Sequence, residues 1–180
     1  NVVRGLKTAA FNIKGDYPEF QYIDPIELLA GRFINNIDIL EKRKVAVIGN
    51  RVRDELFEPG EDPVGEYIRI KGVYFQVIGV FEPKNKNMNF GGDKEQTIHL
   101  PFTSLQQAYN FGDNVHYFAI TALDGIPVAK IEQEAIQILK ERNSIHPDDD
   151  RAIGHFNLGN EFKKMEGLFI GIRVLIWIVG

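Results

Sequence analysis

The sequence ends in an apolar run from Leu168 to Gly180 that carries a single charge, Arg173. A helix that spans a bilayer needs about 20 apolar residues, so this run is too short to cross a membrane as it stands. Trp177 and Arg173 belong to the residue types favoured near lipid headgroups. We therefore expect residues 160–180 to form a stalk and the start of a transmembrane helix. We also expect both ends of the sequence to be cuts within a longer protein, because no signal peptide opens it, a strand is already under way at residue 1, and the apolar run stops abruptly.

Composition limits the class of protein. With 44% hydrophobic and 26% charged residues, the 180-residue chain is typical of one globular domain or two small lobes. The net charge of −4 argues against nucleic acid as a partner, because phosphate binding needs a clustered basic face. The nearest candidate, Lys42 to Lys44 with Arg51 and Arg53, is followed at once by acidic residues. The absence of cysteine excludes disulfides, thiol nucleophiles and thiolate metal sites.

Hydrophobic patterning and turn residues predict a chain rich in strands. Expected strands are 2–13, 44–49, 66–70, 73–81, 96–100, 114–123 and 152–158, with a tight hairpin at Lys71 and Gly72. Expected helices are one that begins at Asp24 and Pro25 and closes at Gly31, then 50–57, 101–108 and 126–142. The strand, helix and strand within 114–158 predict a βαβ unit.

Residues suited to catalysis are few. Ser104 and Ser144 are the only serines, and neither lies in a nucleophile elbow, so Ser104 is expected in the first turn of a helix. A buried strand, Gly49 and a helix follow one another at Val45 to Val52, as in a nucleotide-binding turn. Only one of the required glycines is present, which favours a purely structural turn.

An acidic loop offers the remaining candidates. His146, Asp148, Asp149, Asp150 and His155 lie within ten residues and are of types that bind divalent ions, but no metal-binding spacing fixes their geometry. A solvated surface loop is the favoured interpretation. His99 and His116 are expected in strands, without acidic neighbours and with structural roles. We therefore predict no catalytic, cofactor-binding or metal-binding residue.

An ordered set of short motifs resembles a known family. The motifs are Leu29 to Phe33, Asp38, Lys44 to Gly49, Leu56-Phe57, Asp62 to Gly65, Ile68 to Ile70, Val77 to Val80 and Ile98 to Pro101. Together they resemble the MacB-like periplasmic core domain of ABC transporter permeases, a superfamily that also contains the FtsX and lipoprotein-release permeases. The resemblance implies an α+β fold. Its expected parts are a porter-like βαβ lobe (1–24 and 115–159), an inserted strand-rich lobe (25–114) and the stalk with the start of a transmembrane helix (160–180).

The resemblance also implies a function. Such a domain is non-catalytic, faces the periplasm from the inner membrane, and couples ATP-driven movement of membrane helices to efflux, lipoprotein release or signalling. Implied partners are a cytoplasmic ABC ATPase, a second permease in a homodimer or heterodimer, and in some systems a periplasmic adaptor protein and an outer-membrane channel. Two alternatives stay open: a membrane-anchored periplasmic binding or adhesion module without an ATPase, and a metal enzyme that uses Asp148 and His155.

Overall fold

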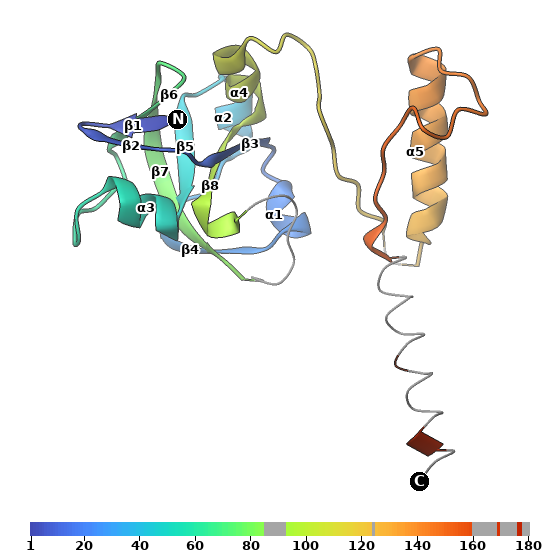
Figure 1. Ribbon diagram of the computed structural model, residues 1–180, viewed down its shortest axis with the longest axis horizontal. Helices are drawn as coiled ribbons and strands as arrows, with labels where there is room; N and C mark the ends of the chain where they lie inside the picture. Colours follow the sequence, from blue (N-terminus) through green and yellow to red (C-terminus); the bar gives the residue numbers. More distant parts are fainter. Residues whose placement is uncertain (85–92, 124, 160–168, 170–175, 178–180) are drawn as a thin grey trace. The chain divides into compact units, whose positions relative to one another are not determined.

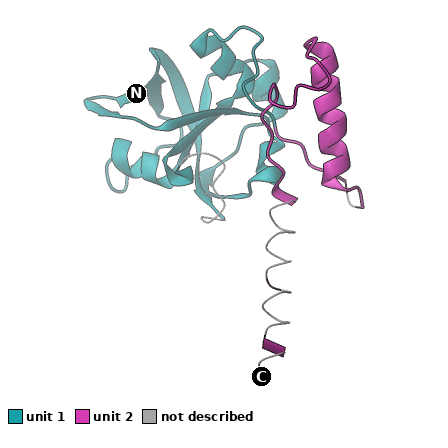
Figure 2. Ribbon diagram, turned by 45° about the vertical axis from the view of Figure 1, so that its right-hand side comes forward, with its two compact units in different colours: residues 1–118 teal, residues 119–180 magenta. Residues whose placement is uncertain are grey.

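The computed structural model describes residues 1–84, 93–123, 125–159, 169 and 176–177. They belong to two compact units, Asn1–Phe118 and Ala119–Gly180 (Figure 2). Nearly all of the stalk and membrane-entry segment expected at 160–180 lies outside the described residues. Among the residues that are described, no helix is both long and apolar enough to span a bilayer.

The first unit is built on a mixed sheet of eight strands (Figure 1). They are β1 (Val2–Arg4), β2 (Lys7–Ala9), β3 (Asn12–Asp16), β4 (Ile26–Gly31), β5 (Val45–Gly49), β6 (Tyr67–Ile70), β7 (Val73–Pro83) and β8 (Thr97–Pro101). The order is β2-β1-β6-β7-β5-β8-β3, and β4 pairs with β7. The pairs β3–β8 and β5–β7 are parallel and the others antiparallel. This mixed sheet with few helices is an α+β fold, as expected.

Short helices complete the unit. They are α1 (Phe20–Ile23), α2 (Asn36–Leu40), α3 (Asn50–Leu56), the 3-10 turn η1 (Lys94–Gln96) and α4 (Phe102–Tyr109). The predicted strands and helices between residues 44 and 108 are confirmed to within two residues or so at each end. The predicted β6–β7 hairpin is also confirmed. Its turn holds Lys71 at φ 50° and Gly72 at φ 85°, the pair of positive φ angles that matches the twist of the strands.

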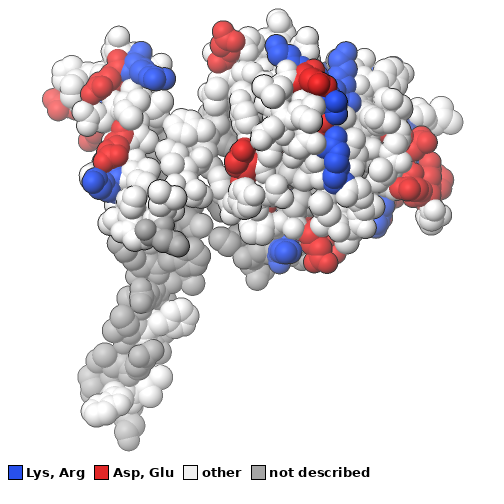
Figure 3. Space-filling model, turned by 180° about the vertical axis from the view of Figure 1, so that it is seen from behind, with Lys and Arg blue, Asp and Glu red and all other residues white. Residues whose placement is uncertain are grey.

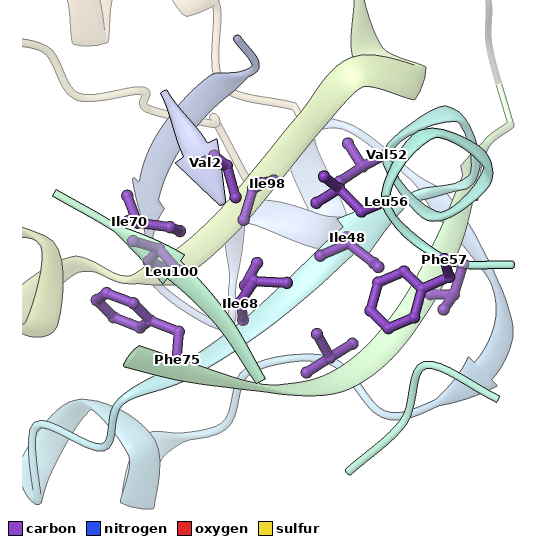
Figure 4. Close-up of a cluster of buried hydrophobic side chains, with 13 residues drawn as sticks. Val2, Ile48, Val52, Leu56, Phe57, Ile68, Ile70, Phe75, Ile98 and Leu100 are labelled. Carbon is purple, nitrogen blue, oxygen red and sulfur yellow. The ribbon is translucent and has the colours of Figure 1, made fainter. Parts of the chain in front are cut away.

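The core has two clusters of apolar side chains. The larger contains Ile48, Ile68, Phe75 and Leu100, and Figure 4 shows these side chains converging between the strands and α3. Val47 joins the smaller cluster. Because successive residues of a strand point to opposite faces, the two clusters lie on opposite faces of β5. A register shift in the β5–β7 pair keeps both clusters continuous along the bent strand β7.

The helix predicted from Asp24 to Gly31 is wrong. Asp24 instead ends α1, and Ile26–Gly31 forms β4, which pairs with the second half of β7. Tertiary strand pairing here outweighs the local helix-start pattern, because β7 offers a row of backbone donors and acceptors. The long N-terminal strand is also interrupted: Gly5, at φ 55°, turns β1 back into β2.

The second unit contains α5 (Val128–Arg142), which confirms the helix predicted there. The strands predicted at 114–123 and 152–158 are not formed in the described residues. An extended segment becomes a strand only when a neighbour supplies hydrogen bonds, and among the described residues neither segment is paired. Val115, Phe118 and Ile120 are correspondingly exposed. The expected division into a porter-like lobe and an inserted lobe stays a prediction.

Candidate functional site

Buried polar side chains gather where β3, β8 and α1 meet. In the parallel β3–β8 pair, Lys14 lies opposite His99, and the alternation of β3 places Asp16 on the same face as Lys14. The Nδ1 atom of His99 lies 2.5 Å from Oδ2 of Asp16, and both side chains are almost completely buried. The histidine and the carboxylate thus satisfy each other inside the protein.

Aromatic rings surround this pair. The ring centroids of Phe20, Phe33 and Phe81 lie 6.1, 5.8 and 4.9 Å from that of His99. Phe33 and Phe81 belong to the smaller apolar cluster, so the imidazole lies against apolar packing on one side and its carboxylate partner on another. Exclusion of water by such packing strengthens the His99–Asp16 interaction.

A second pair of charges lies beside the first. Nζ of Lys94 donates a hydrogen bond of 2.6 Å to Asp24, and both side chains are about nine-tenths buried. Burial lowers the pKa of Lys14 below its ordinary value, although the charges of Asp16 and Asp24 act in the opposite direction. The contact between Lys94 and Asp24 fastens η1 to the end of α1, two segments far apart in sequence.

The cavity at this polar centre is very small. It measures about 10 Å³ and is lined by residues of both charge pairs together with the surrounding aromatic rings. That volume is enough for about one water molecule and far below what an organic substrate requires. The arrangement therefore holds secondary-structure elements together and has no room for a substrate to react.

Asp38 forms another buried polar contact. Its carboxylate accepts bonds of 2.6 and 3.0 Å from the guanidinium of Arg32 and one of 2.9 Å from the backbone N–H of Asn35. The Asn35 side chain in turn accepts a bond from the Asp38 N–H, which completes a capping box at the start of α2. Burial by itself raises the pKa of Asp38. The bonds from Arg32 and Asn35 and the charge of Arg43 outweigh it, so the net shift is downward.

The serine and glycine candidates have structural surroundings. Ser104 lies in the first turn of α4, as predicted, and its hydroxyl donates a 2.8 Å bond to the carbonyl oxygen of Arg43. A Cβ atom on Gly49 would lie 2.2 Å from the carbonyl oxygen of Glu95. The backbone of η1 therefore occupies the space where a phosphate would have to approach this turn.

The residues of the acidic loop are exposed and bind one another or nearby helix residues. Asp149 accepts bonds from the backbone N–H groups of Arg151 and Ala152, Asp150 pairs with Lys140, and His155 lies 3.6 Å from Glu132. Within the part of the chain that the structure describes, no three acidic or histidine residues are grouped to hold a metal ion.

The expectation that His99 lacks an acidic neighbour is wrong. Asp16 is separated from it by 83 positions in sequence, and only the parallel pairing of β3 with β8 brings them together. The sequence does contain a pattern that points to a shared polar face. Polar residues occur at alternate positions in both strands, Lys14 and Asp16 in β3 and Thr97 and His99 in β8. His116, also expected in a strand, lies in an unpaired segment and packs edge-on against Phe111.

Comparison with known proteins extends these observations. The model of one family, the MacB-like periplasmic core domain, matches residues 1–138. The pyoverdine export ATP-binding/permease protein PvdT of Pseudomonas entomophila (strain L48) is 28% identical over 185 residues, which cover 99% of this chain and 28% of that protein. The macrolide export ATP-binding/permease protein MacB of Syntrophobacter fumaroxidans is 40% identical over 94 residues, covering 52% and 13%. The chain thus spans a minor part of the length of these relatives.

Solved structures show the same fold. The periplasmic region of MacB from Actinobacillus actinomycetemcomitans matches 79% of this chain and 62% of its own with a TM-score of 0.63 at 18% identity. The extracellular domain of the transporter YknZ from Gram-positive bacteria matches 79% and 70% with a TM-score of 0.60 at 15% identity. At these identities the likeness concerns the fold, and it confirms the α+β class.

Proposed function

Since the chain belongs to the MacB-like periplasmic core domain family, the periplasmic part of ABC transporter permeases, we propose that it transmits ATP-driven movement of membrane helices into the periplasm. The observation that carries this proposal is the family match over residues 1–138. The work done in the periplasm would be efflux, lipoprotein release or signalling, and the curated relatives in the comparison are named as export proteins.

The interior of the first unit supports a mechanical role. Its apolar clusters are closely packed, and the cavity among the buried charges is no larger than about 10 Å³. A close-packed interior has low compressibility and transmits strain. Movement applied at one edge of such a unit would therefore displace the whole body.

The proposed partners follow from the family. They are a cytoplasmic ABC ATPase, a second permease in a homodimer or heterodimer, and in some systems a periplasmic adaptor protein and an outer-membrane channel. The domain would face the periplasm from the inner membrane. Residues 160–180 would act as the stalk and membrane entry, leading into a porter-like lobe of residues 1–24 and 115–159, with 25–114 as the inserted lobe.

Insertion of three glycines after Asn160 in the full-length permease tests the proposal. A helical link between membrane and domain, which this proposal requires, would be broken by the insertion, since glycine is a poor helix former. ATP hydrolysis should continue, whereas transport of the payload into the periplasm should fall to the level of an ATPase-dead control. The same insertion after Asn89 is the matched control and should leave transport intact. Full transport with the stalk insertion would refute mechanical coupling through residues 160–180.

The alternative of a membrane-anchored binding or adhesion module without an ATPase is tested separately. Purification of the full-length protein from its native membrane should recover an ABC ATPase, either on the same chain or as a subunit. An epitope at Asn89 should be cleaved by protease in spheroplasts and protected in intact cells. Recovery of the protein without any ATPase would favour the binding module, and cleavage only after lysis of the inner membrane would place the domain in the cytosol.

A further inference from the structure

A groove lies on the first unit, away from the buried charges. It has a volume of about 470 Å³ and lies between β4 and the loop that follows α3. Leu29 and Ala30 line it on the β4 side, Pro59 and Pro63 on the loop side, and Val80 of β7 also contributes to its lining. Leu29 is 45% exposed, so the groove presents an apolar side chain to solvent. It is large enough to accept one or two side chains of a partner.

The loop side of the groove is held firmly by the β1–β2 hairpin. The guanidinium of Arg4 lies 4.1 Å from the ring centroid of Phe57, donates to the carbonyl oxygen of Leu56 and pairs with Glu61. Lys7 donates a 3.1 Å bond to the carbonyl oxygen of Phe57. A groove fixed in advance loses little freedom when a partner binds, which favours affinity.

The β4 side is an unpaired strand edge. Within the described sheet, β2, β3 and β4 each pair with a single strand. β2 is only three residues long and begins with Lys7, a charged residue of the kind that protects an edge. β4 is longer, has no lysine, and exposes both Leu28 and Leu29. Such an edge can accept an added strand.

The rim of the groove is acidic. Asp54, Glu58, Glu61 and Asp62 line the groove, against one basic residue, Arg53. The basic partners Arg4, Lys7 and Arg53 offset only part of this charge. Figure 3 shows acidic side chains gathered at the right-hand edge, the side on which α3 and its following loop lie when the view of Figure 1 is turned by 180°.

From these features we propose that the groove docks an extended, basic segment of a partner protein. The segment would lie along β4 and place an apolar side chain against Leu29 and Val80. Lysine or arginine residues beside that side chain would face Glu58 and Asp62. The proposal commits to a polypeptide because the strand edge, the apolar groove and the acidic rim lie together, and only an extended chain can use all three.

Binding of a fluorescent peptide to the 180-residue chain tests the proposal. The probe is a peptide of alternating valine and lysine, and a peptide of alternating valine and glutamate with the same length is its control. Leu29→Ala removes part of the apolar contact, and Leu40→Ala, at another exposed leucine, is the matched control. Glu58→Lys reverses a charge on the rim. The matched control is Glu41→Lys. Glu58 forms an exposed ion pair of 2.8 Å with Lys7, and Glu41 forms one of the same length with Arg43.

Fluorescence anisotropy should show saturable binding of the valine–lysine peptide and none of the valine–glutamate peptide. Leu29→Ala and Glu58→Lys should each weaken binding by about fivefold, and the two control variants by less than twofold or so. Equal binding of both peptides, or equal affinity in all four variants, would overturn the proposal. Displacement of the peptide by a small apolar amine of equal affinity would also overturn it, because the groove would then be a small-molecule site.

Discussion

Asp16 and His99 illustrate at the residue scale how a buried polar pair stabilises a fold. Nδ1 of His99 lies within hydrogen-bonding distance of Oδ2 of Asp16, and both side chains are buried. His99→Leu should cost about 1–3 kcal/mol, because the buried carboxylate of Asp16 then loses this hydrogen bond. The double variant His99→Leu/Asp16→Leu should cost about 1–3 kcal/mol less than the sum of the two single variants.

A double-mutant cycle in urea would measure this coupling. The control cycle pairs Asp16→Leu with His146→Leu, at an exposed histidine of the second unit, and should be additive to within about 0.5 kcal/mol. Additivity in the His99 cycle as well would mean that the observed contact does not stabilise the native state.

The lowered pKa of Asp38 predicts that the stability of the fold depends on pH. Its pKa is lower in the folded state than the ordinary value of 3.8, so the unfolded state binds more protons as the pH falls. The carboxylate therefore stabilises the fold fully above the unfolded pKa, and this contribution is lost as the pH falls through the folded pKa. Asp38→Asn should cost about 2–3 kcal/mol at neutral pH and less in acid.

Urea unfolding of the Asp38→Asn variant and the parent chain at pH 7 and at lower pH values would show whether this difference narrows. Glu41→Gln, at an exposed ion pair, is the control and should change stability by no more than about 0.5 kcal/mol throughout. A constant difference for Asp38→Asn at all pH values would refute the assigned role of its charge.

At the scale of elements, the close pairing of β4 with β7 depends on glycine. Gly31 has φ 70°, and a Cβ atom there would lie 2.1 Å from the carbonyl oxygen of Ile78. Gly60 also has a positive φ, of 86°, but a Cβ atom there would meet nothing within 4 Å. Gly60→Ala should therefore cost about 1–2 kcal/mol from backbone strain alone. Gly31→Ala should cost clearly more, because the two strands must also separate.

Thermal unfolding of the two glycine variants separates these causes. The difference between their melting temperatures reports the steric contact, since the backbone strain is similar in both. If the two variants lowered the melting temperature equally, β4 would be able to move away from β7 without a cost in stability.

The whole molecule consists of a tightly packed first unit and a second unit whose described helix, α5, buries little apolar surface. Leu100 is fully buried in the larger apolar cluster, whereas Ile138 of α5 is 52% exposed. Leu100→Ala should cost about 2–5 kcal/mol through the cavity it creates. Ile138→Ala should cost no more than about 0.5 kcal/mol in the same 180-residue chain. Urea unfolding followed by circular dichroism would test both, and a large loss for Ile138→Ala would show that α5 is covered in solution.

The sequence by itself determined the family resemblance, the α+β class, the strands and α-helices from Val45 to Tyr109, and the helix α5. The strands and helices follow from local patterns of apolar residues, glycine and proline, whereas the α+β class was implied by the family resemblance. Only the tertiary structure decided that residues 26–31 form a strand and that His99 meets Asp16. It also decided that segments 114–123 and 152–158 have no strand partner among the described residues. Each of these outcomes depends on which distant segment supplies a hydrogen-bond partner, and no local pattern contains that information.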